Sequence, residues 1–429
     1  MLNSNPITLA QMLQKIIKVE PHEIGAALAS FAYFFCLLCG YYILRPVRDE
    51  MGISGGLANL PWLFTGTFIV MFAAVPVFGW ASARLPRAAL LPLVYGFFIA
   101  NLLIFYALMT YGADMRLVAP AFFIWVSVFN LFVVSVFWSF MVDIYSEPQA
   151  QRLFGFIAAG GSAGALTGPA LTAALAVALG TAKLLLVSAA FLALALLFIY
   201  QLLNWARKHS TPQRQARGGE PIGGSAWAGI TMVARSPYLL GICAYMLLYS
   251  LLFSFVYFEQ ARIMAESYGT SNERVRIFAT LDFATNLLAL AMQIFVVPRL
   301  FKWLGIAITL ALLPALSAAG FVVLGVYPLL AVVVVFQVVR RAGEYAIAKP
   351  ARELLFTVLG REQKYKAKNF VDTVVFRGAD AASGWLYAAA KGLGASVSAL
   401  SFIAAPLALG WMVLGWHLGK KQQAMLKTD

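Results

Sequence analysis

The chain has few residues of the kinds that build catalytic or metal sites. It contains three cysteines and three histidines in 429 residues, and only 18 aspartate and glutamate residues. Cys36, Cys39 and Cys243 lie inside predicted hydrophobic spans, where a packed thiol is expected. The sequence holds no nucleophile with a nearby base, no metal-ligand set and no nucleotide-hydrolysing GxxxxGK loop. These absences argue against an enzyme, a cofactor or metal site, and an ATP-driven pump.

Charge is also scarce. Charged residues make up 12% of the chain and hydrophobic residues 62%, and the mean hydropathy is +0.81. A soluble core cannot bury so many apolar side chains, so we expect an all-α, polytopic membrane protein. Scanning for runs of about 20 mostly apolar residues predicts twelve transmembrane helices. They lie near residues 24–44, 60–81, 88–110, 117–142, 153–177, 182–203, 237–259, 276–298, 305–326, 328–350, 368–391 and 395–418.

Basic residues are distributed unevenly between the predicted loops. Twenty Lys and Arg residues lie on the side that holds both termini and eight on the other side, which puts both termini in the cytoplasm. In this setting the net charge of +14 does not indicate nucleic acid binding. The polar N-terminal stretch has no cleavage pattern, so the first span is expected to remain as an anchor. We expect an integral protein of a bacterial inner membrane, acting as a monomer.

The middle of the chain divides it into two halves. Residues 204–236 are basic, contain Gly and Pro, and lead into a candidate surface helix, which predicts a cytoplasmic linker. On either side of it we expect six-helix bundles, at residues 1–203 and 237–418, followed by a cytoplasmic tail at 419–429. The halves show weak internal symmetry, because acidic, polar and basic residues precede a small-residue helix after both span four and span ten. Two six-helix bundles with a substrate site between them are the major-facilitator arrangement.

Small residues are concentrated in the fifth span, between Gly155 and Gly168. Such a surface predicts close contact with another helix, either as static packing or as a rocking surface. The sequence alone does not separate these two roles.

The charged residues inside the membrane are concentrated between Gln337 and Trp385. A central Arg, Lys or Asp facing lipid costs roughly 2.5 to 3.5 kcal/mol, so these side chains are expected to face protein or water. The polar and basic residues expected to bind an anionic substrate are Arg45, Arg48, Gln337, Arg340, Arg341, Lys349 and Arg377. The acidic residues expected to form ion pairs or to carry a coupling proton are Asp49, Asp143, Asp282, Glu344, Asp372 and Asp380.

Two roles are open for the charges of spans ten and eleven. Arginine side chains bind carboxylates and phosphates in a bidentate manner, which suits an anionic substrate. Alternatively the charges neutralise one another inside the protein. The second role predicts ion pairs between Arg340 or Arg341 and Glu344, and between Arg377 and Asp380.

The first span ends in the sequence YYILRPVRDEMG. Pro46 is expected to end the helix, so that Arg45, Arg48 and Asp49 follow it. These residues then form either a solvated outer loop or a helical face that extends into the mouth of a substrate cavity.

Three segments resemble one family. They are YYILRPVRDEMG, VDIYSEPQAQRLFGFIAAGGSAG and RELLFTVLGREQKYKAKNFVDTV, and the resemblance to the ATP/ADP translocases of plastids and intracellular bacteria extends over all twelve spans. It implies a facilitator-like fold and, in the characterised members, nucleotide exchange across a membrane. Arg48 with Asp49 matches the family's basic-acidic pair after the first span, and Lys366 with Lys368 matches its KxK segment before span eleven.

The chain departs from the family pattern at two positions. Phe64 stands where nucleotide exchangers tend to carry the lysine of a Pro-x-Leu-Lys motif, and Gln149 stands where an acid is expected. Losing a cation and an acid changes the charge that a substrate would meet. Substrate identity therefore does not follow from the resemblance.

The leading functional hypothesis is a secondary transporter of an organic or phosphorylated anion that works by alternating access, with ATP/ADP-like antiport among the candidates. The alternative is proton-coupled symport or export of another small solute, with Glu344, Asp380 or Asp282 as the titrating group. A membrane receptor or scaffold ranks below both, because buried charge is costly without a ligand pathway.

Overall fold

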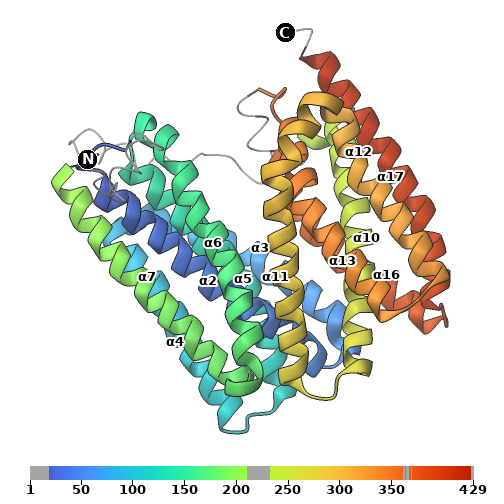
Figure 1. Ribbon diagram of the computed structural model, residues 1–429, viewed down its shortest axis with the longest axis horizontal. Helices are drawn as coiled ribbons and strands as arrows, with labels where there is room; N and C mark the ends of the chain where they lie inside the picture. The colour runs from blue at the N-terminus through green and yellow to red at the C-terminus, as the bar shows by residue number, and fades with distance from the viewer. Residues whose placement is uncertain (1–18, 210–231, 361–362, 364–366, 369, 427–429) are drawn as a thin grey trace, which may run out of the picture. The chain divides into compact units, whose positions relative to one another are not determined.

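The computed structural model describes residues 19–209, 232–360, 363, 367–368 and 370–426. Throughout this part of the chain the regular structure is helical, as expected, and no strand occurs in it (Figure 1). Ten of the described helices are long and apolar enough to cross a membrane. The integral membrane protein predicted from composition is therefore supported, whereas the predicted count of twelve spans is not confirmed.

The described residues of the first half, 19–209, form six long helices. The helices from α2 to α7 are α2 (Ile24–Ser54), α3 (Leu60–Arg84), α4 (Arg87–Thr110), α5 (Met115–Ile144), α6 (Glu147–Leu179) and α7 (Thr181–His209). A short 3-10 turn, Leu57–Asn59, joins α2 to α3. Each predicted span in this half is a helix, and most of these helices extend beyond the apolar run at one or both ends.

The described part of the second half contains four long helices and two that are interrupted. The long ones are α10 (Pro237–Ser267), α11 (Ser271–Phe295), α12 (Val297–Val326) and α17 (Val397–Met425). Gly305, with a φ of 68°, breaks the first two turns of α12 from the remainder. The predicted span 328–350 consists of α13 (Leu330–Gly343), the π-helical turn η2 (Glu344–Ala348) and the start of α14 (Lys349–Leu355). The predicted span 368–391 consists mainly of the π-helical turn η3 (Val371–Val375) and α16 (Phe376–Gly392).

One prediction about the first span is wrong. Pro46 does not end the helix, because α2 continues through it to Ser54. Proline removes one backbone hydrogen bond, but tertiary packing can hold the helix together around it. Pro46 and the apolar side chains beside it are buried. Arg45, Arg48 and Asp49 are therefore helical residues and do not belong to a solvated loop.

The described chain forms two compact units. Unit 1 contains the described parts of residues 1–48, 75–114 and 125–221, and unit 2 those of 49–74, 115–124 and 222–429. Helices α2, α3 and α5 each contribute residues to both units. The division of the chain at residues 203 and 237 stays a prediction, and most of the predicted linker, residues 210–231, lies outside the described residues.

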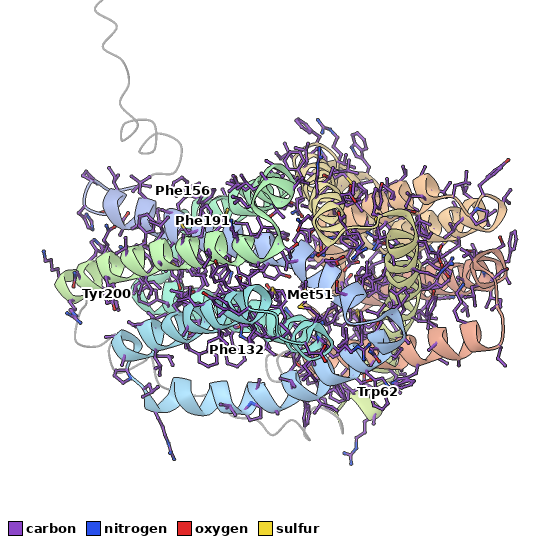
Figure 2. The ribbon with its side chains drawn as sticks, turned by 90° about the horizontal axis from the view of Figure 1, so that it is seen from below. Met51, Trp62, Phe132, Phe156, Phe191 and Tyr200 are labelled. Atoms are coloured by element: carbon purple, nitrogen blue, oxygen red, sulfur yellow. The ribbon has the colours of Figure 1, made fainter. Side chains whose placement is uncertain are left out.

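Unit 1 is held together by close contacts to α2. Figure 2 shows Phe156 of α6 and Phe191 of α7 on the α2 side of these helices. The ring of Phe156 stacks on Phe31 with centroids 4.9 Å apart, and Phe191 meets Phe35 edge to face at 6.3 Å. Cys36 and Cys39, on the same helix, are buried free thiols, as expected.

Glycines allow α6 to approach α2. A Cβ added to Gly160 would meet the carbonyl oxygen of Phe31, and one added to Gly164 would meet that of Phe35. Two helix backbones approach this closely only where one of them carries no side chain. The predicted close contact of the fifth span is therefore confirmed.

A polar cluster joins the start of α6 to the residue before α2. Ser146 caps α6 with Gln149, and Gln149 Nε2 donates to Glu23 Oε1 at 2.7 Å. Arg152 Nη2 lies 3.1 Å from the same carboxylate. Burial by itself raises the pKa of Glu23, but the hydrogen bonds from the Glu20 backbone, Gln149 and Arg152 outweigh it, and the pKa is lowered from its ordinary value. Glu23 is thus expected to be ionised at neutral pH.

In unit 2, α12 runs alongside α17, and α10 packs against α16 and α17 (Figure 1). Gly419 of α17 faces Ala307 of α12 so closely that no side chain would fit there. Trp411, one of the largest fully buried side chains, lies between these helices and α10, where its ring centroid is 5.3 Å from that of Tyr245. This packing holds α10 in place for the charged residues of α13, α14 and α16.

Replacing Gly164 by Ala is expected to destabilise the protein by about 1 to 3 kcal/mol, because the new methyl group overlaps the α2 backbone. The matched control is Gly155→Ala on the same helix, where nothing lies within 4 Å of the added Cβ. This control is expected to be neutral or to stabilise by up to about 1 kcal/mol through helix propensity. Thermal unfolding of both variants in detergent measures the difference, and equal midpoints would contradict the proposed contact.

Candidate functional site

The charged residues of the tenth predicted span lie around a π-helical turn. Arg340 and Arg341 lie in the last turn of α13, and Glu344 is the first residue of η2. All three side chains are buried. A π turn is rare and is found frequently at functional sites, since it inserts an extra residue into a helical turn and changes which face the following residues occupy. A second π turn, η3, precedes Arg377 and Asp380 on α16. Both interrupted helices therefore carry their charges next to a π turn.

Arg341 is neutralised by a residue of a different helix. Its Nη2 lies 2.6 Å from Asp282 Oδ1 on α11, and both side chains are almost completely buried. The predicted pairing of Arg341 with Glu344 is wrong, because no ion pair of Glu344 within 4.0 Å occurs among the described residues. Asp282 was expected to be an ion-pair or coupling residue, and the structure makes it the partner of Arg341.

Arg340 has a different environment. Its Nη2 donates to Gln337 Oε1 at 2.8 Å, and its guanidinium carbon lies 4.5 Å from the centre of the Phe253 ring on α10. Among the described residues no carboxylate lies within ion-pair distance of Arg340, and its buried Nε–H has no hydrogen-bond acceptor. Gln337 and Phe253 orient the side chain, but neither supplies a negative charge.

On α16, Arg377 and Asp380 form the predicted ion pair, with Nη1 and Oδ2 3.7 Å apart. Asp380 is buried, and its other oxygen accepts a short hydrogen bond from Ser250 of α10. Arg377 is half-buried and lies over the ring of Phe376. Asp380 is therefore held by two partners from two helices.

Glu344 is a buried carboxylate between cations. Arg352, Lys349 and Arg340 are the basic residues whose charges act on it, in descending order of strength. Lys349 itself is exposed, although it was expected inside the tenth span. Asp372, in η3, is partly exposed, and its Oδ1 lies 3.7 Å from Arg352 Nη2.

Three of the remaining predicted residues belong to unit 1. Arg45 lies over the ring of Tyr42, with 5.7 Å between its guanidinium carbon and the ring centre. Arg48 and Asp143 are partly buried within α2 and α5. The structure thus brings Gln337, Arg340, Arg341, Glu344, Arg377, Asp380, Asp282, Asp372 and Lys349 together in unit 2, and separates Arg45, Arg48 and Asp143 from them in the division into units.

A second group of charged residues lies at the end of α2, where sequence reasoning expected Asp49 but missed Glu50 and its partner Arg274. Glu50 is completely buried and forms a bidentate ion pair with Arg274 of α11, at 2.6 Å and 2.8 Å. Next to it, Tyr257 of α10 donates to Asp49 Oδ1 at 3.1 Å. We call Asp49, Glu50, Tyr257 and Arg274 the Glu50 cluster. The two arginines and two acids of RPVRDE were visible in the sequence. The burial of the two acids was not, because the helix was expected to end at Pro46.

Aromatic side chains extend the Glu50 cluster toward α3. Phe64 lies with its ring centre 5.6 Å from that of Tyr257 and 5.2 Å from that of Phe258. Trp385 of α16 donates to Thr65 at 3.1 Å. Phe64, the position that departs from the family's lysine, is therefore part of an apolar contact within unit 2.

A third group joins α10 to α16 within the second half of the chain. Glu259 is fully buried and accepts from Lys391 at 2.8 Å, from Tyr387 at 3.1 Å and from Arg262 at 3.1 Å. All of its partners come from α10 and α16. It is a fully satisfied buried carboxylate, which suits a fixed structural contact.

Comparisons with known proteins agree with this architecture. The family model of the Major Facilitator Superfamily matches residues 24–343. ADP,ATP carrier protein 1 of Chlamydia muridarum is 23% identical over 84% of this chain and 80% of its own length, and its Chlamydia trachomatis counterpart is 21% identical over the same shares. The crystal structure of the POT family transporter PepTSo superposes with a TM-score of 0.65 at 12% identity, covering 93% of this chain and 98% of its own. The resemblance to ATP/ADP translocases with a facilitator-like fold is thereby confirmed.

The Arg341–Asp282 pair generates a testable prediction. Arg341→Gln is expected to lower the free energy of unfolding by about 3 to 5 kcal/mol, because the buried Asp282 carboxylate loses this cation. The double variant Arg341→Gln with Asp282→Asn is expected to regain most of that loss, since two neutral amides replace the two charges. Thermal unfolding of the single and double variants measures this recovery, and a double variant no more stable than Arg341→Gln would contradict the pairing.

Proposed function

The chain belongs to the major facilitator superfamily, and from this membership we propose that it is a secondary transporter that moves a phosphorylated organic anion by alternating access. The observation that carries the proposal is the buried Arg340 guanidinium without a carboxylate partner among the described residues. A buried cation costs several kcal/mol unless an anion compensates it. A substrate anion meets this requirement.

The nature of the anion is supported by the geometry of arginine. A guanidinium offers a planar set of donors that matches carboxylate and phosphate oxygens. The neighbouring Arg341 and Arg377 already have carboxylate partners, whereas Arg340 has none within 4.0 Å among the described residues. The curated relatives are named as ADP,ATP carriers. Exchange of adenine nucleotides is therefore the substrate hypothesis to test first.

A second candidate function is proton-coupled movement of another solute. Glu344 favours it, because this buried carboxylate has no ion pair within 4.0 Å in the described part of the chain and would need a proton or a cation to balance its charge. Its neighbours Arg340 and Arg352 supply positive charge nearby, which keeps anion exchange ahead of this alternative.

The proposal is tested by uptake of labelled ADP into proteoliposomes that contain the purified protein. Wild type is expected to take up ADP only when nucleotide is present inside, and a pH gradient is expected to have no effect. Uptake that depends on the pH gradient and needs no internal nucleotide would favour the proton-coupled alternative. No uptake under any condition, from folded protein, would exclude adenine nucleotides.

Arg340→Gln is expected to reduce exchange by about a hundredfold or more, the loss that follows when a buried charge-assisted contact worth about 3 kcal/mol is removed. The variant is expected to fold, because no carboxylate loses its partner. Arg262→Gln is the matched control, since Arg262 is paired with Glu259 and Glu266 and lies outside the proposed site. Exchange that survives in Arg340→Gln at the wild-type rate would refute the role of Arg340.

Alternating access requires contacts that open and close, and the Glu50 cluster has the properties of such a contact. It joins the end of α2 and the start of α3 to α10 and α11, and all of these residues belong to unit 2. Opening this end of the protein would separate Glu50 from Arg274 and Phe64 from Phe258. The Glu259 contacts, which lie on α10 and α16 alone, would remain.

Glu50→Gln is expected to shift the population about tenfold or more toward the state in which this end is open, as losing about 1.4 kcal/mol or more requires. Spin labels at Ala58→Cys and Ser267→Cys, both exposed positions, report the distance by pulsed EPR. The expected result is a larger share of long distances. Glu259→Gln is the control and is expected to leave the distribution unchanged, whereas identical distributions in wild type and Glu50→Gln would contradict the role of the cluster.

A further inference from the structure

Arg352 on α14 is a buried arginine two residues beyond the end of the predicted span 328–350. Its side chain is only 11% exposed. Nη1 donates to the thioether sulfur of Met246 at 3.2 Å, and Nη2 lies 3.7 Å from Asp372 Oδ1. The Nε–H is buried and has no acceptor among the described residues.

These contacts do not satisfy the guanidinium. A thioether is a weak acceptor, and 3.7 Å exceeds the length of an N–H···O hydrogen bond, which is about 2.7 to 3.2 Å. Two other arginines of unit 2, Arg274 and Arg341, each have a carboxylate oxygen 2.6 Å away. A buried donor without an acceptor calls for an explanation, and a bound anion is one.

The π turn η2 determines where Arg352 points. A residue advances by about 100° in an α-helix and by about 82° in a π turn, because a π turn takes roughly 4.4 residues. These rotations about the helix axis can be added from Arg340 through η2 to Arg352. The side chain of Glu344 then projects about 40°, and that of Arg352 about 30°, from the direction of the Arg340 side chain. An uninterrupted α-helix would instead put Arg352 about 120° away. The π turn therefore aligns the two arginines, with Glu344 between them.

The contacts on α10 agree with this alignment. Arg340 lies over Phe253 and Arg352 contacts Met246, and these partners are seven residues apart on α10 and so occupy one face of it. Arg352 and Arg340 both act electrostatically on Glu344. One stripe of α13, η2 and α14 thus carries two incompletely paired arginines and one carboxylate, and Asp372 of η3 adds a second carboxylate 3.7 Å from Arg352.

We propose that Arg352 is a second anion-binding residue, which binds a phosphate group at the α14 end of the stripe formed by Arg340, Glu344 and Arg352. The inference rests on the proposed function for the phosphorylated nature of the substrate, and it adds a second residue that binds the phosphate group. A planar guanidinium with a free Nε–H and loosely held Nη groups presents a bidentate edge to phosphate oxygens. The substrate meets Arg352 and Arg340 in turn as it moves along the stripe.

The test measures binding of inorganic pyrophosphate to the purified full chain in neutral detergent, by the rise in its unfolding temperature at constant ionic strength. Wild type is expected to show a saturable rise. Arg352→Gln is expected to weaken the apparent affinity at least tenfold, and Arg352→Lys, which keeps the charge but loses the fork, several-fold. Arg262→Gln is the control and is expected to bind as wild type does. Unchanged binding in Arg352→Gln would overturn the proposal.

A substitute variant and a second ligand complete the experiment. If Arg352→Gln does not fold, Arg352→Met takes its place, because it keeps an apolar contact with Met246 and buries no charge. Phosphatidylglycerol added in place of pyrophosphate identifies the other source of phosphate, a lipid headgroup. A rise that depends on Arg352 with the lipid and not with pyrophosphate overturns the assignment to a soluble substrate.

Pyrophosphate binding tests the Arg352 site, and ADP exchange tests the proposed function, so that either can fail without the other. Wild-type protein that binds pyrophosphate through Arg352 but does not exchange ADP would retain this site and exclude adenine nucleotides. Protein that exchanges ADP with an unchanged KM in Arg352→Gln, and whose pyrophosphate binding is also unaffected by this change, would keep the proposed function and exclude Arg352 from it.

Discussion

The cost of burying positive charge within a membrane protein determines the arrangement of unit 2. Each buried arginine must find a counter-charge or a dense set of acceptors, because an isolated cation in this environment is unstable. Arg341 finds Asp282, and Arg274 finds Glu50. Arg340 and Arg352 have only neutral acceptors at hydrogen-bond distance among the described residues. In the proposed anion transporter, the bound substrate supplies the negative charge that Arg340 and Arg352 lack at hydrogen-bond distance. It is released when the protein rearranges these contacts.

The two π turns connect this electrostatic requirement to the helices. An α-helix with a period of 3.6 residues spreads residues 340, 344 and 352 over about 120° of its surface. The turn at Glu344–Ala348 brings them to within about 40°. On the other interrupted helix, η3 contains Asp372 and precedes the Arg377–Asp380 pair. A turn that differs from α by one residue is also a place where a helix can change its phase, which suits the proposed alternating-access transport.

Much of the fold could be predicted from the sequence. Hydropathy located each helix, because long apolar runs leave few alternatives in a membrane, and the glycines of the fifth span indicated the contact that Gly160 and Gly164 make with α2. The face on which the residues beyond Glu344 lie could not be predicted, since a π turn leaves no trace in hydropathy. The partner of Arg341 was missed because Asp282 is 59 residues away in the chain. The Glu50–Arg274 pair was missed because Pro46 was expected to end a helix that the surrounding packing continues.

The central claim is that Arg340 receives the charge of the substrate. A structure of the protein determined with ADP bound tests it most directly. The account predicts phosphate oxygens within about 3 Å of the Arg340 guanidinium, the distance of a charge-assisted hydrogen bond. Bound ADP with its phosphates held elsewhere, and Arg340 still contacting only Gln337 and Phe253, would contradict it.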